Sequence, residues 1–376
     1  MDAENISYLG RDVDALLGFT ARKAMSNRAV LDIIGEALFD DDGEILSDHE
    51  RGLMSNALKV LVCELEDSIR RELRAGVGVS RNLAESFERH GRDIAYPVLA
   101  GAGLLRADEL IEAVKHRVQT HRLSLALNHQ RRQAASTNRD SEQDDNVIQS
   151  LLREPSRQTL EGLKHYLAAE SGRVDTFQNP RIRPIDLPAE VSPRLWWWVS
   201  AALRKHAAEN EPVDHRELDD AIEQATSGIL ARVAAVQGQL GEANAVIDGM
   251  TAIGRFSPDA LLQFLQQGEV PLFEAAFARA TGLRPRLVSR LLYEPDGEGL
   301  AVACKAIGFD REVFAIIFDH TRHALLSIEA PGHDRQSVQV NALFDRIDSD
   351  TAAAVLDMWR RDTGFLYALK QIEPGP

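Results

Sequence analysis

A helix–glycine–helix pattern repeats in the C-terminal half of the chain and constrains the fold more than any other feature. Residues 278–288 and 304–314 align without a gap at a distance of 26 residues, which places Gly282 and Gly308 in register. An earlier copy around Gly254 precedes the Gly282 copy by 28 residues. Each copy predicts a helix, a glycine at its end, an apolar residue and a second helix. Because one such unit cannot bury its apolar face alone, neighbouring units are expected to stack.

The rest of the chain also carries apolar residues at helical spacing. Leu53, Leu61, Leu65 and Leu73 belong to one broad apolar stripe within a single long segment. Alternating β-branched runs bounded by turn residues are nearly absent. The sequence therefore predicts an all-α protein, built as a HEAT-like α-solenoid of short helical hairpins with an additional C-terminal helical region.

The N-terminal half shows a weaker version of the same period. Three segments, 70–73, 95–98 and 123–126, start 25 and 28 residues apart. Short helices are expected between them, over 82–89 and 108–115. A turn is then expected between His116 and His121.

Shifts in composition divide the chain into five consecutive segments. We expect N-terminal helices over 1–45, HEAT-like repeats over 46–133, a polar linker or loop over 134–146, a C-terminal helical repeat domain over 147–326 and a helical tail over 327–376. Within the fourth segment, residues 176–193 contain four prolines, which forbid a continuous helix.

The charge balance argues against binding to a polyanion. Asp and Glu outnumber Lys and Arg by 58 to 43, which gives a net charge of −15, whereas nucleic-acid-binding proteins usually carry the opposite sign. The two cysteines are too few for a disulfide framework. The longest apolar stretch, 195–203, is far shorter than the ~20 residues of a membrane helix. The acidic N-terminus does not resemble a secretory signal, so we expect a cytoplasmic protein without a membrane span.

The sequence contains no motif that indicates catalysis, a cofactor or a metal. Signatures of nucleotide-binding loops and nucleophilic catalysis are absent. Residues 40–45 resemble the middle of a calcium loop, but Leu38 and His49 occupy its first and twelfth positions, where carboxylates are needed. His320 and His323 share one helical face but lack a further ligand motif. We therefore expect neither an enzyme nor a bound cofactor.

Two clusters are candidates for binding a protein partner. Arg70, Arg71 and Arg74 lie within about one helical turn and could hold an acidic partner, although Glu66 and Glu72 are close enough to neutralise them. On this interpretation the arginines form part of a docking surface; the alternative is an ordinary solvated helix face.

The second cluster is the run of three tryptophans, Trp196, Trp197 and Trp198. Successive helical residues diverge by about 100°, so the three rings cannot share one face. We expect two rings in the core, where the proline-rich stretch folds back, and at least one at a boundary or a protein interface. Anchoring at a membrane surface is a third alternative.

The copy around Gly282 also matches the spacing of a helix-turn-helix over 273–292. Arg284, Arg286 and Arg290 would then lie on or near the helix that enters the DNA major groove. The next copy carries Asp310 and Glu312 in the corresponding helix, which favours repeat packing. A nucleic-acid-binding regulator remains the alternative function.

Several short motifs occur in the order seen in a known bacterial family. They are Glu50-Arg-Gly-Leu-Met54, Val62-Cys-Glu-Leu-Glu-Asp-Ser-Ile-Arg-Arg-Glu-Leu73, Ile94-Ala-Tyr-Pro-Val-Leu99, Asp108-Glu-Leu-Ile111, His121-Arg-Leu-Ser-Leu-Ala126, Arg173-Val-Asp-Thr-Phe-Gln178, Trp197-Trp-Val-Ser-Ala-Ala-Leu-Arg204, Leu272-Phe-Glu-Ala275 and Glu294-Pro-Asp-Gly-Glu-Gly-Leu300. Over roughly residues 46–325 the chain resembles the family described as domain of unknown function 2336.

The resemblance implies a HEAT-like helical-repeat fold and supplies no catalytic residues. The polar stretch from Ala134 to Asp145 departs from the pattern, because it stands where another helical unit would be expected. From the repeat and the lack of a catalytic motif, we predict a protein-binding scaffold or regulatory adaptor. Self-association is an open alternative, and nucleic acid is disfavoured as a partner.

Overall fold

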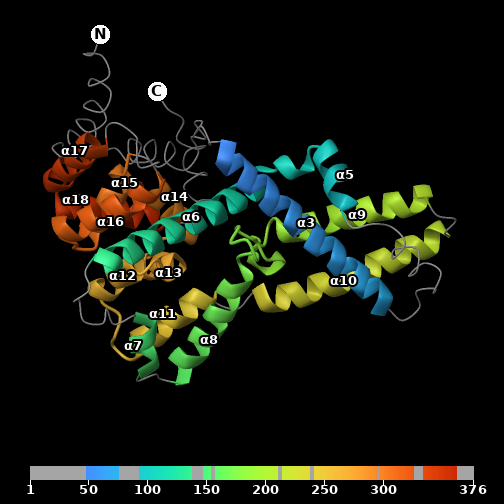
Figure 1. Ribbon diagram of the computed structural model, residues 1–376, viewed down its shortest axis with the longest axis horizontal. Coiled ribbons are helices and arrows are strands. Elements are labelled where there is room, and N and C mark those ends of the chain that lie inside the picture. Colours follow the sequence, from blue (N-terminus) through green and yellow to red (C-terminus); the bar gives the residue numbers. More distant parts are fainter. Residues whose placement is uncertain are drawn as a thin grey trace, which may run out of the picture. The chain divides into compact units, whose positions relative to one another are not determined.

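The computed structural model describes residues 48–75, 93–137, 147–153, 157–210, 214–237, 241–294, 296–325 and 333–361. Within these ranges every regular element is a helix, apart from one isolated bridge between Val174 and Pro180. The prediction of an all-α protein is confirmed for these residues (Figure 1). The helices are α3 (Asp48–Ala75), α5 (Ala95–Gly101), η1 (Leu104–Arg106), α6 (Asp108–Thr137), α7 (Val147–Arg153), α8 (Arg157–Gly172), η2 (Pro184–Asp186), α9 (Ser192–Asn210), α10 (His215–Gln237), α11 (Glu242–Ala252), α12 (Pro258–Gln266), α13 (Val270–Thr281), α14 (Pro285–Tyr293), α15 (Glu298–Ala306), α16 (Arg311–Leu325), α17 (His333–Arg346) and α18 (Ser349–Trp359), where η marks a 3₁₀ helix.

Several predicted features lie outside the described residues. They are the N-terminal helices over 1–45, the calcium-like segment 40–45, the short helix over 82–89 and most of the linker. Helix α6 includes residues 134–137, the first four residues of the expected linker. Ala134 and Ala135 are strong helix formers and extend the helix past the point where the polar composition begins.

Helix α6 also corrects the prediction of a short helix over 108–115. Residues 108–137 form one helix of 30 residues, so the turn expected between His116 and His121 does not exist. The sequence of this segment contains no Gly and no Pro, and nothing local therefore interrupts the helical hydrogen bonds.

The chain divides into two compact units. Of the described residues, those within 122–160 and 246–361 form one unit, and those within 48–121 and 161–245 form the other. We call them unit 1 and unit 2. Both units are discontinuous in sequence, whereas the predicted segments are consecutive. The division into independently folding domains stays a prediction.

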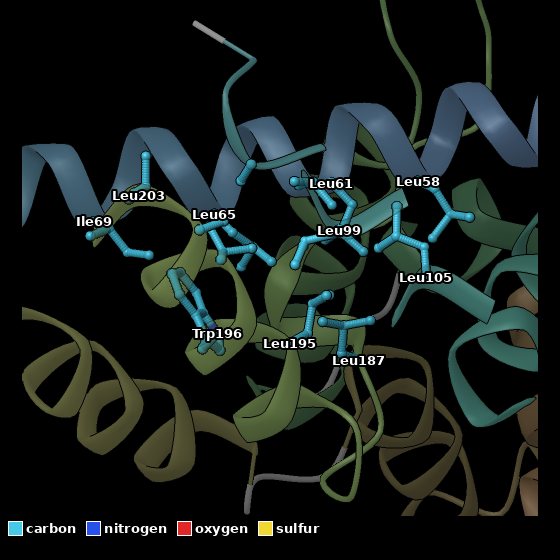
Figure 2. Close-up of a cluster of buried hydrophobic side chains, with 14 of the residues drawn as sticks. Leu58, Leu61, Leu65, Ile69, Leu99, Leu105, Leu187, Leu195, Trp196 and Leu203 are labelled. Atoms are coloured by element: carbon cyan, nitrogen blue, oxygen red, sulfur yellow. The ribbon is translucent and has the colours of Figure 1, made fainter. Parts of the chain in front are cut away.

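In unit 2, the long helix α3 packs against α5, α9 and α10. Figure 2 shows Leu61 and Leu65 of α3 facing Leu99 of α5 and Trp196 of α9. These four side chains are at most 2% exposed. The apolar stripe that predicts a single long helix over this segment thus forms one side of the unit 2 core.

A buried ion pair holds α3 to the start of α5. The Glu66 carboxylate accepts hydrogen bonds from the backbone N–H groups of Ile94 and Ala95, at 3.0 and 2.9 Å. It also accepts a bond of 2.6 Å from the Arg70 guanidinium. Glu66 and Arg70 are 1% and 4% exposed. Glu66 therefore satisfies two donors at a helix N-terminus and neutralises a buried cation.

Unit 1 contains the three predicted helix–glycine–helix copies, except that α11 begins in unit 2. Helices α11 and α12, α13 and α14, and α15 and α16 are joined through Gly254, Gly282 and Gly308. The three glycines have φ values of 69°, 68° and 79°, a left-handed conformation that L side chains adopt with strain. The repeated glycine therefore marks the end of the first helix in each copy.

The second helix of two copies begins with a side-chain cap. The Ser257 hydroxyl accepts from the N–H of Ala260 at the start of α12, at 3.2 Å. The Asp310 carboxylate accepts from the N–H of Val313 at the start of α16, at 2.8 Å.

Consecutive helices from α12 to α17 pack against each other, and α18 packs against α15.

Candidate partner-binding site

The tryptophan run lies in α9 and is divided between the core and the surface of unit 2. Trp196 is 2% exposed and belongs to the hydrophobic core together with Leu187 from the proline-rich stretch. Trp198 is partly buried against the same core. Trp197 is 40% exposed. The helical angle between neighbouring residues thus separates the rings as expected, and Trp197 is the ring that reaches the surface.

Charged residues flank Trp197 on the exposed face of α9. The Arg194 guanidinium lies 6.0 Å from the centroid of the Trp198 ring and forms an ion pair of 3.1 Å with Glu109. About two helical turns beyond Trp197, Arg204 binds both carboxylate oxygens of Asp219, at 2.6 and 3.2 Å. We call this surface, formed by Arg194, Trp197 and Arg204, the α9 face.

The arginine cluster of α3 does not form a single surface. Arg70 is buried in the ion pair with Glu66, so its guanidinium is not available to a partner. Arg71 and Arg74 are exposed. Arg71 donates to the backbone carbonyl of Asp67 and to the Ser68 hydroxyl, at 3.2 and 3.0 Å. Only the two exposed arginines remain candidates for contact with a partner.

The three arginines of the helix-turn-helix alternative are placed unevenly. Arg286 is exposed, whereas Arg284 and Arg290 are half-buried. Arg290 forms an ion pair of 3.5 Å with Glu294. A helix that reads DNA presents several side chains to base edges together. The helix-turn-helix alternative stays a prediction.

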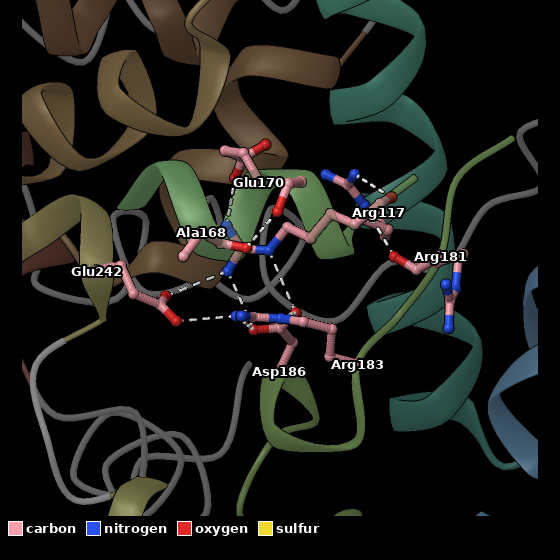
Figure 3. Close-up of polar contacts among 9 residues, drawn as sticks. Arg117, Ala168, Glu170, Arg181, Arg183, Asp186 and Glu242 are labelled. Atoms are coloured by element: carbon pink, nitrogen blue, oxygen red, sulfur yellow. Dashed lines mark hydrogen bonds and ion pairs between the residues drawn. The ribbon is translucent and has the colours of Figure 1, made fainter. Parts of the chain in front are cut away.

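A polar network in unit 2 contains residues that sequence analysis did not select. Two guanidinium groups, those of Arg173 and Arg183, converge on the Asp186 carboxylate with bonds between 2.5 and 3.2 Å. Glu242 accepts from both arginines, at 3.4 and 2.9 Å, and Glu170 pairs with Arg173. Figure 3 shows Glu242 and Asp186 directed toward the guanidinium groups. The network joins α8, the proline-rich stretch and the first residue of α11.

The electrostatics of this network indicate a structural role. Burial alone would raise the pKa of Asp186, but hydrogen bonds from Arg183 and Arg173 hold that pKa below its usual range. For Glu242, burial also raises the pKa, but the bond from Arg183, a backbone hydrogen bond and the charges of Arg183 and Arg173 together lower it below its usual value. Both carboxylates are therefore ionised at neutral pH and fully occupied by arginine donors. Such groups are poorly suited to general acid or base catalysis.

Removing the Asp186 charge should make unit 2 less sensitive to acid. The lowered pKa of folded Asp186 stabilises the fold above the unfolded value of about 3.9, and this contribution is lost as the pH falls through the folded pKa. We expect Asp186→Asn to lower the free energy of unfolding by about 1–3 kcal/mol at pH ~7, and by much less at pH ~3. Urea denaturation followed by tryptophan fluorescence measures both values.

Asp219→Asn is the matched control, because it removes the carboxylate of an exposed ion pair in the same unit. Solvent screening should make its effect at neutral pH the smaller of the two. Equal losses for both variants at pH ~7, or an Asp186→Asn loss that does not shrink in acid, would contradict the structural role.

Neither cysteine of the chain carries an activated thiol in the structure. Burial, followed by the charge of Asp93, raises the pKa of the Cys63 thiol to about 11. Burial also raises the pKa of Cys304. A raised pKa leaves little reactive thiolate at neutral pH. In the described part of the chain, no group of three or more His, Cys, Asp or Glu residues could hold a metal ion.

One comparison with known proteins decides the family. The model of the bacterial family described as "Uncharacterised protein conserved in bacteria (DUF2336)" matches residues 94–357. The chain belongs to this family. The match includes α9, the polar network and all three helix–glycine–helix copies, and it leaves out α3. No curated protein and no solved structure matches the chain.

The family match extends the resemblance stated from the motifs toward the C-terminus, from 325 to 357, and begins later, at 94 instead of 46. The family description gives no activity, substrate or partner. A function for this chain must therefore be argued from its own residues.

Proposed function

We propose that this protein is a protein-binding scaffold or adaptor of the bacterial cytoplasm, with a HEAT-like α-solenoid in unit 1 and a docking surface on the α9 face of unit 2. The solenoid is supported by the three helix–glycine–helix copies and by the packing of consecutive helices from α12 to α17. In repeat proteins of this kind, each helical pair buries its apolar face on its neighbours.

The observation that carries the docking surface is the exposure of Trp197. Its two neighbours pack on the core, which fixes the backbone of α9 at this position. An exposed ring on a rigid helix loses little conformational freedom when a partner covers it. Trp and Arg are also the residues most enriched among those that dominate protein–protein binding. The α9 face supplies one exposed Trp between two Arg residues.

The ion pairs of the α9 face set its expected specificity. Arg194 and Arg204 are 46% and 39% exposed at the side chain, and each is paired with a carboxylate of its own unit. Such pairs contribute little to affinity in water and tune the rate of association and the choice of partner. We therefore assign the binding energy mainly to Trp197.

None of the helices that the structure describes combines the length and the apolar character needed to cross a bilayer. The proposal assigns Trp197 to a protein interface, because Trp is enriched among the residues that dominate protein–protein binding. Vesicle binding by the wild-type protein that Trp197→Ala abolishes would instead favour the membrane-surface alternative.

The proposal predicts that Trp197→Ala removes a partner from the bound fraction. The tagged full-length chain is incubated with a native cytosolic extract, and the proteins recovered are compared by quantitative mass spectrometry. At least one protein recovered by the wild type should fall by about tenfold or more with Trp197→Ala, as expected for a central aromatic contact.

Leu167→Ala is the control, because Leu167 of α8 is 44% exposed in the same unit and lies outside the α9 face. It should leave recovery of that partner unchanged. The proposal fails if the wild type recovers no specific protein, or if both variants recover every protein equally well.

A further inference from the structure

The chain reverses direction between α8 and η2 in a short hairpin, which we call the 173–181 hairpin. The backbone N–H of Arg181 donates to the carbonyl of Arg173 at 2.9 Å, and that of Asp175 donates to the carbonyl of Asn179 at 3.0 Å. Hydrogen exchange of these two amides therefore reports whether the hairpin is closed.

A side chain inside the hairpin keeps its tip closed. One carboxylate oxygen of Asp175, Oδ1, accepts from the backbone N–H groups of Phe177 and Asn179, both at 2.8 Å, and the other accepts from the Asn179 amide at 3.0 Å. The Phe177 residue at the tip is 84% exposed, so its ring contributes little to holding the hairpin in place.

Two side chains of α6 bond to the backbone of the hairpin. Arg117 donates to the carbonyls of Arg181 and Arg173, at 3.1 and 2.6 Å, and Figure 3 shows its guanidinium directed toward the chain at Arg181. One helical turn further along α6, the His121 ring donates to the backbone carbonyl of Gln178. Arg117 therefore holds the base of the hairpin, and His121 holds its tip.

His121 lies where a positive charge is unfavourable. It is only 6% exposed, and Arg117 lies four residues before it on the same face of α6. Burial, followed by the charge of Arg117, lowers the pKa of His121, and the bond to Gln178 and the charge of Asp175 offset only part of this effect. The ring is therefore neutral at neutral pH.

The two arginines at the base of the hairpin are paired with carboxylates. Arg181 forms an ion pair with Glu64 of α3, and Arg173 forms one with Asp186. Arginine keeps its charge at every accessible pH, whereas a histidine changes its charge in mild acid. Among the groups that hold the hairpin, His121 is thus the one that responds to a modest fall in pH.

We propose that His121 is an acid-sensitive latch, which holds the 173–181 hairpin against α6 at neutral pH and lets it open in mild acid. The buried position disfavours the charged ring, whereas in an open hairpin water would hydrate it. The open form therefore takes up a proton more readily than the closed form. Opening becomes more favourable as the pH falls below about 6.5, the pKa of a hydrated imidazole. This latch does not depend on the scaffold proposal or on the α9 face.

The first test measures where His121 titrates. The imidazole signals of the full-length protein are followed by NMR from pH ~8 to ~4.5, and His121→Gln identifies the signal of His121. We expect His121 to titrate at a lower pH than a free histidine side chain. A midpoint at or above that of the free side chain would overturn the proposal.

The second test asks whether protonation opens the hairpin. Hydrogen exchange of the Asp175 and Arg181 amides is measured at pH ~8 and ~5 and corrected for the intrinsic rate at each pH. Hydrogen bonds, the backbone bond from Asn179 foremost, lower the pKa of Asp175, so that carboxylate stays ionised over this range. Protection should fall at least about threefold at pH ~5, while the amides of α10 keep theirs. Constant protection in the hairpin, or an equal fall in α10, would overturn the proposal.

The variant His121→Gln keeps a neutral donor for Gln178 and should remove the pH dependence of protection. His215→Gln is the control, because His215 is exposed at the start of α10 and its replacement should leave that dependence unchanged. A fall in protection that persists in His121→Gln would contradict the latch.

Asp175→Asn keeps the proposal testable if His121→Gln fails to close the hairpin. It retains the Oδ1 acceptor for both backbone N–H groups and removes a charge that favours protonated His121. His121 should then titrate at a still lower pH, and protection should fall more between pH ~8 and ~5 than in the wild type. A higher titration midpoint or a smaller fall would show that His121 does not control the hairpin.

Discussion

Glu66→Ala should destabilise unit 2 by about 3–5 kcal/mol, the cost of breaking a buried ion pair by removing one partner. The variant leaves the Arg70 guanidinium, 4% exposed, without its carboxylate. It also removes the acceptor for the N–H groups of Ile94 and Ala95 at the start of α5. Three of the four tryptophans of the chain lie in α9 of this unit, so tryptophan fluorescence in urea follows its unfolding.

Helix α3 offers a matched control for Glu66. Glu72 on the same helix forms an ion pair of 2.6 Å with Arg232, but the two side chains are 32% and 61% exposed. Glu72→Ala should cost less than about 1 kcal/mol, since exposed pairs contribute little. The double variant Glu66→Met with Arg70→Met should recover part of the loss, because no unpaired charge stays buried. Similar losses for Glu66→Ala and Glu72→Ala would show that the first pair is not buried as described.

Gly297→Ala should destabilise unit 1 by about 2–5 kcal/mol, through two costs that act together. Gly297 precedes α15 with a φ of 72°, which strains any L side chain. A Cβ atom at this position would also meet the ring of Phe318, 2.7 Å from Cδ2 and closer still to Cε2. That ring is 1% exposed and stands next to the Arg322 guanidinium, 5.1 Å from the ring centroid. It has little room to move.

Gly308→Ala separates the two costs. Gly308 has a φ of 79°, but a Cβ atom there would have no neighbour within 4 Å. Its replacement should therefore cost only the backbone strain of about 1–2 kcal/mol. Hydrogen exchange of the α15 and α16 amides measures both variants in the same unit. An effect of Gly297→Ala no larger than that of Gly308→Ala would contradict the packing of Phe318 against this backbone.

The sequence predicted a helix correctly where a short-range pattern, such as a terminal Gly or an apolar stripe, marks it. The glycine at the end of α11, α13 and α15 needs a left-handed backbone, and that requirement is visible in the sequence as a repeated Gly. The apolar stripe of α3 is visible for the same reason, since its period follows helix geometry. The turn predicted within α6 rested on the period of neighbouring segments and had no Gly or Pro to support it.

Long-range contacts were beyond the reach of these patterns. Glu66 and Ile94 are 28 residues apart and meet only because α5 packs on α3. Arg173 and Glu242 are 69 residues apart, and no spacing pattern in the sequence predicts that they belong to one network. The arginine cluster of α3 was selected by its sequence neighbours, whereas burial and the ion pair with Glu66 determine what Arg70 does. The exposed Phe177 was likewise part of a motif whose bonds become apparent only in the structure.

The dissociation constant of the partner recovered through the α9 face tests the scaffold proposal most directly. Wild type, Trp197→Ala and Leu167→Ala are compared by calorimetry with the same purified partner. We expect at least about 30-fold weaker binding for Trp197→Ala and no more than about a twofold change for Leu167→Ala. Equal dissociation constants for wild type and Trp197→Ala would show that the α9 face is not where the partner binds.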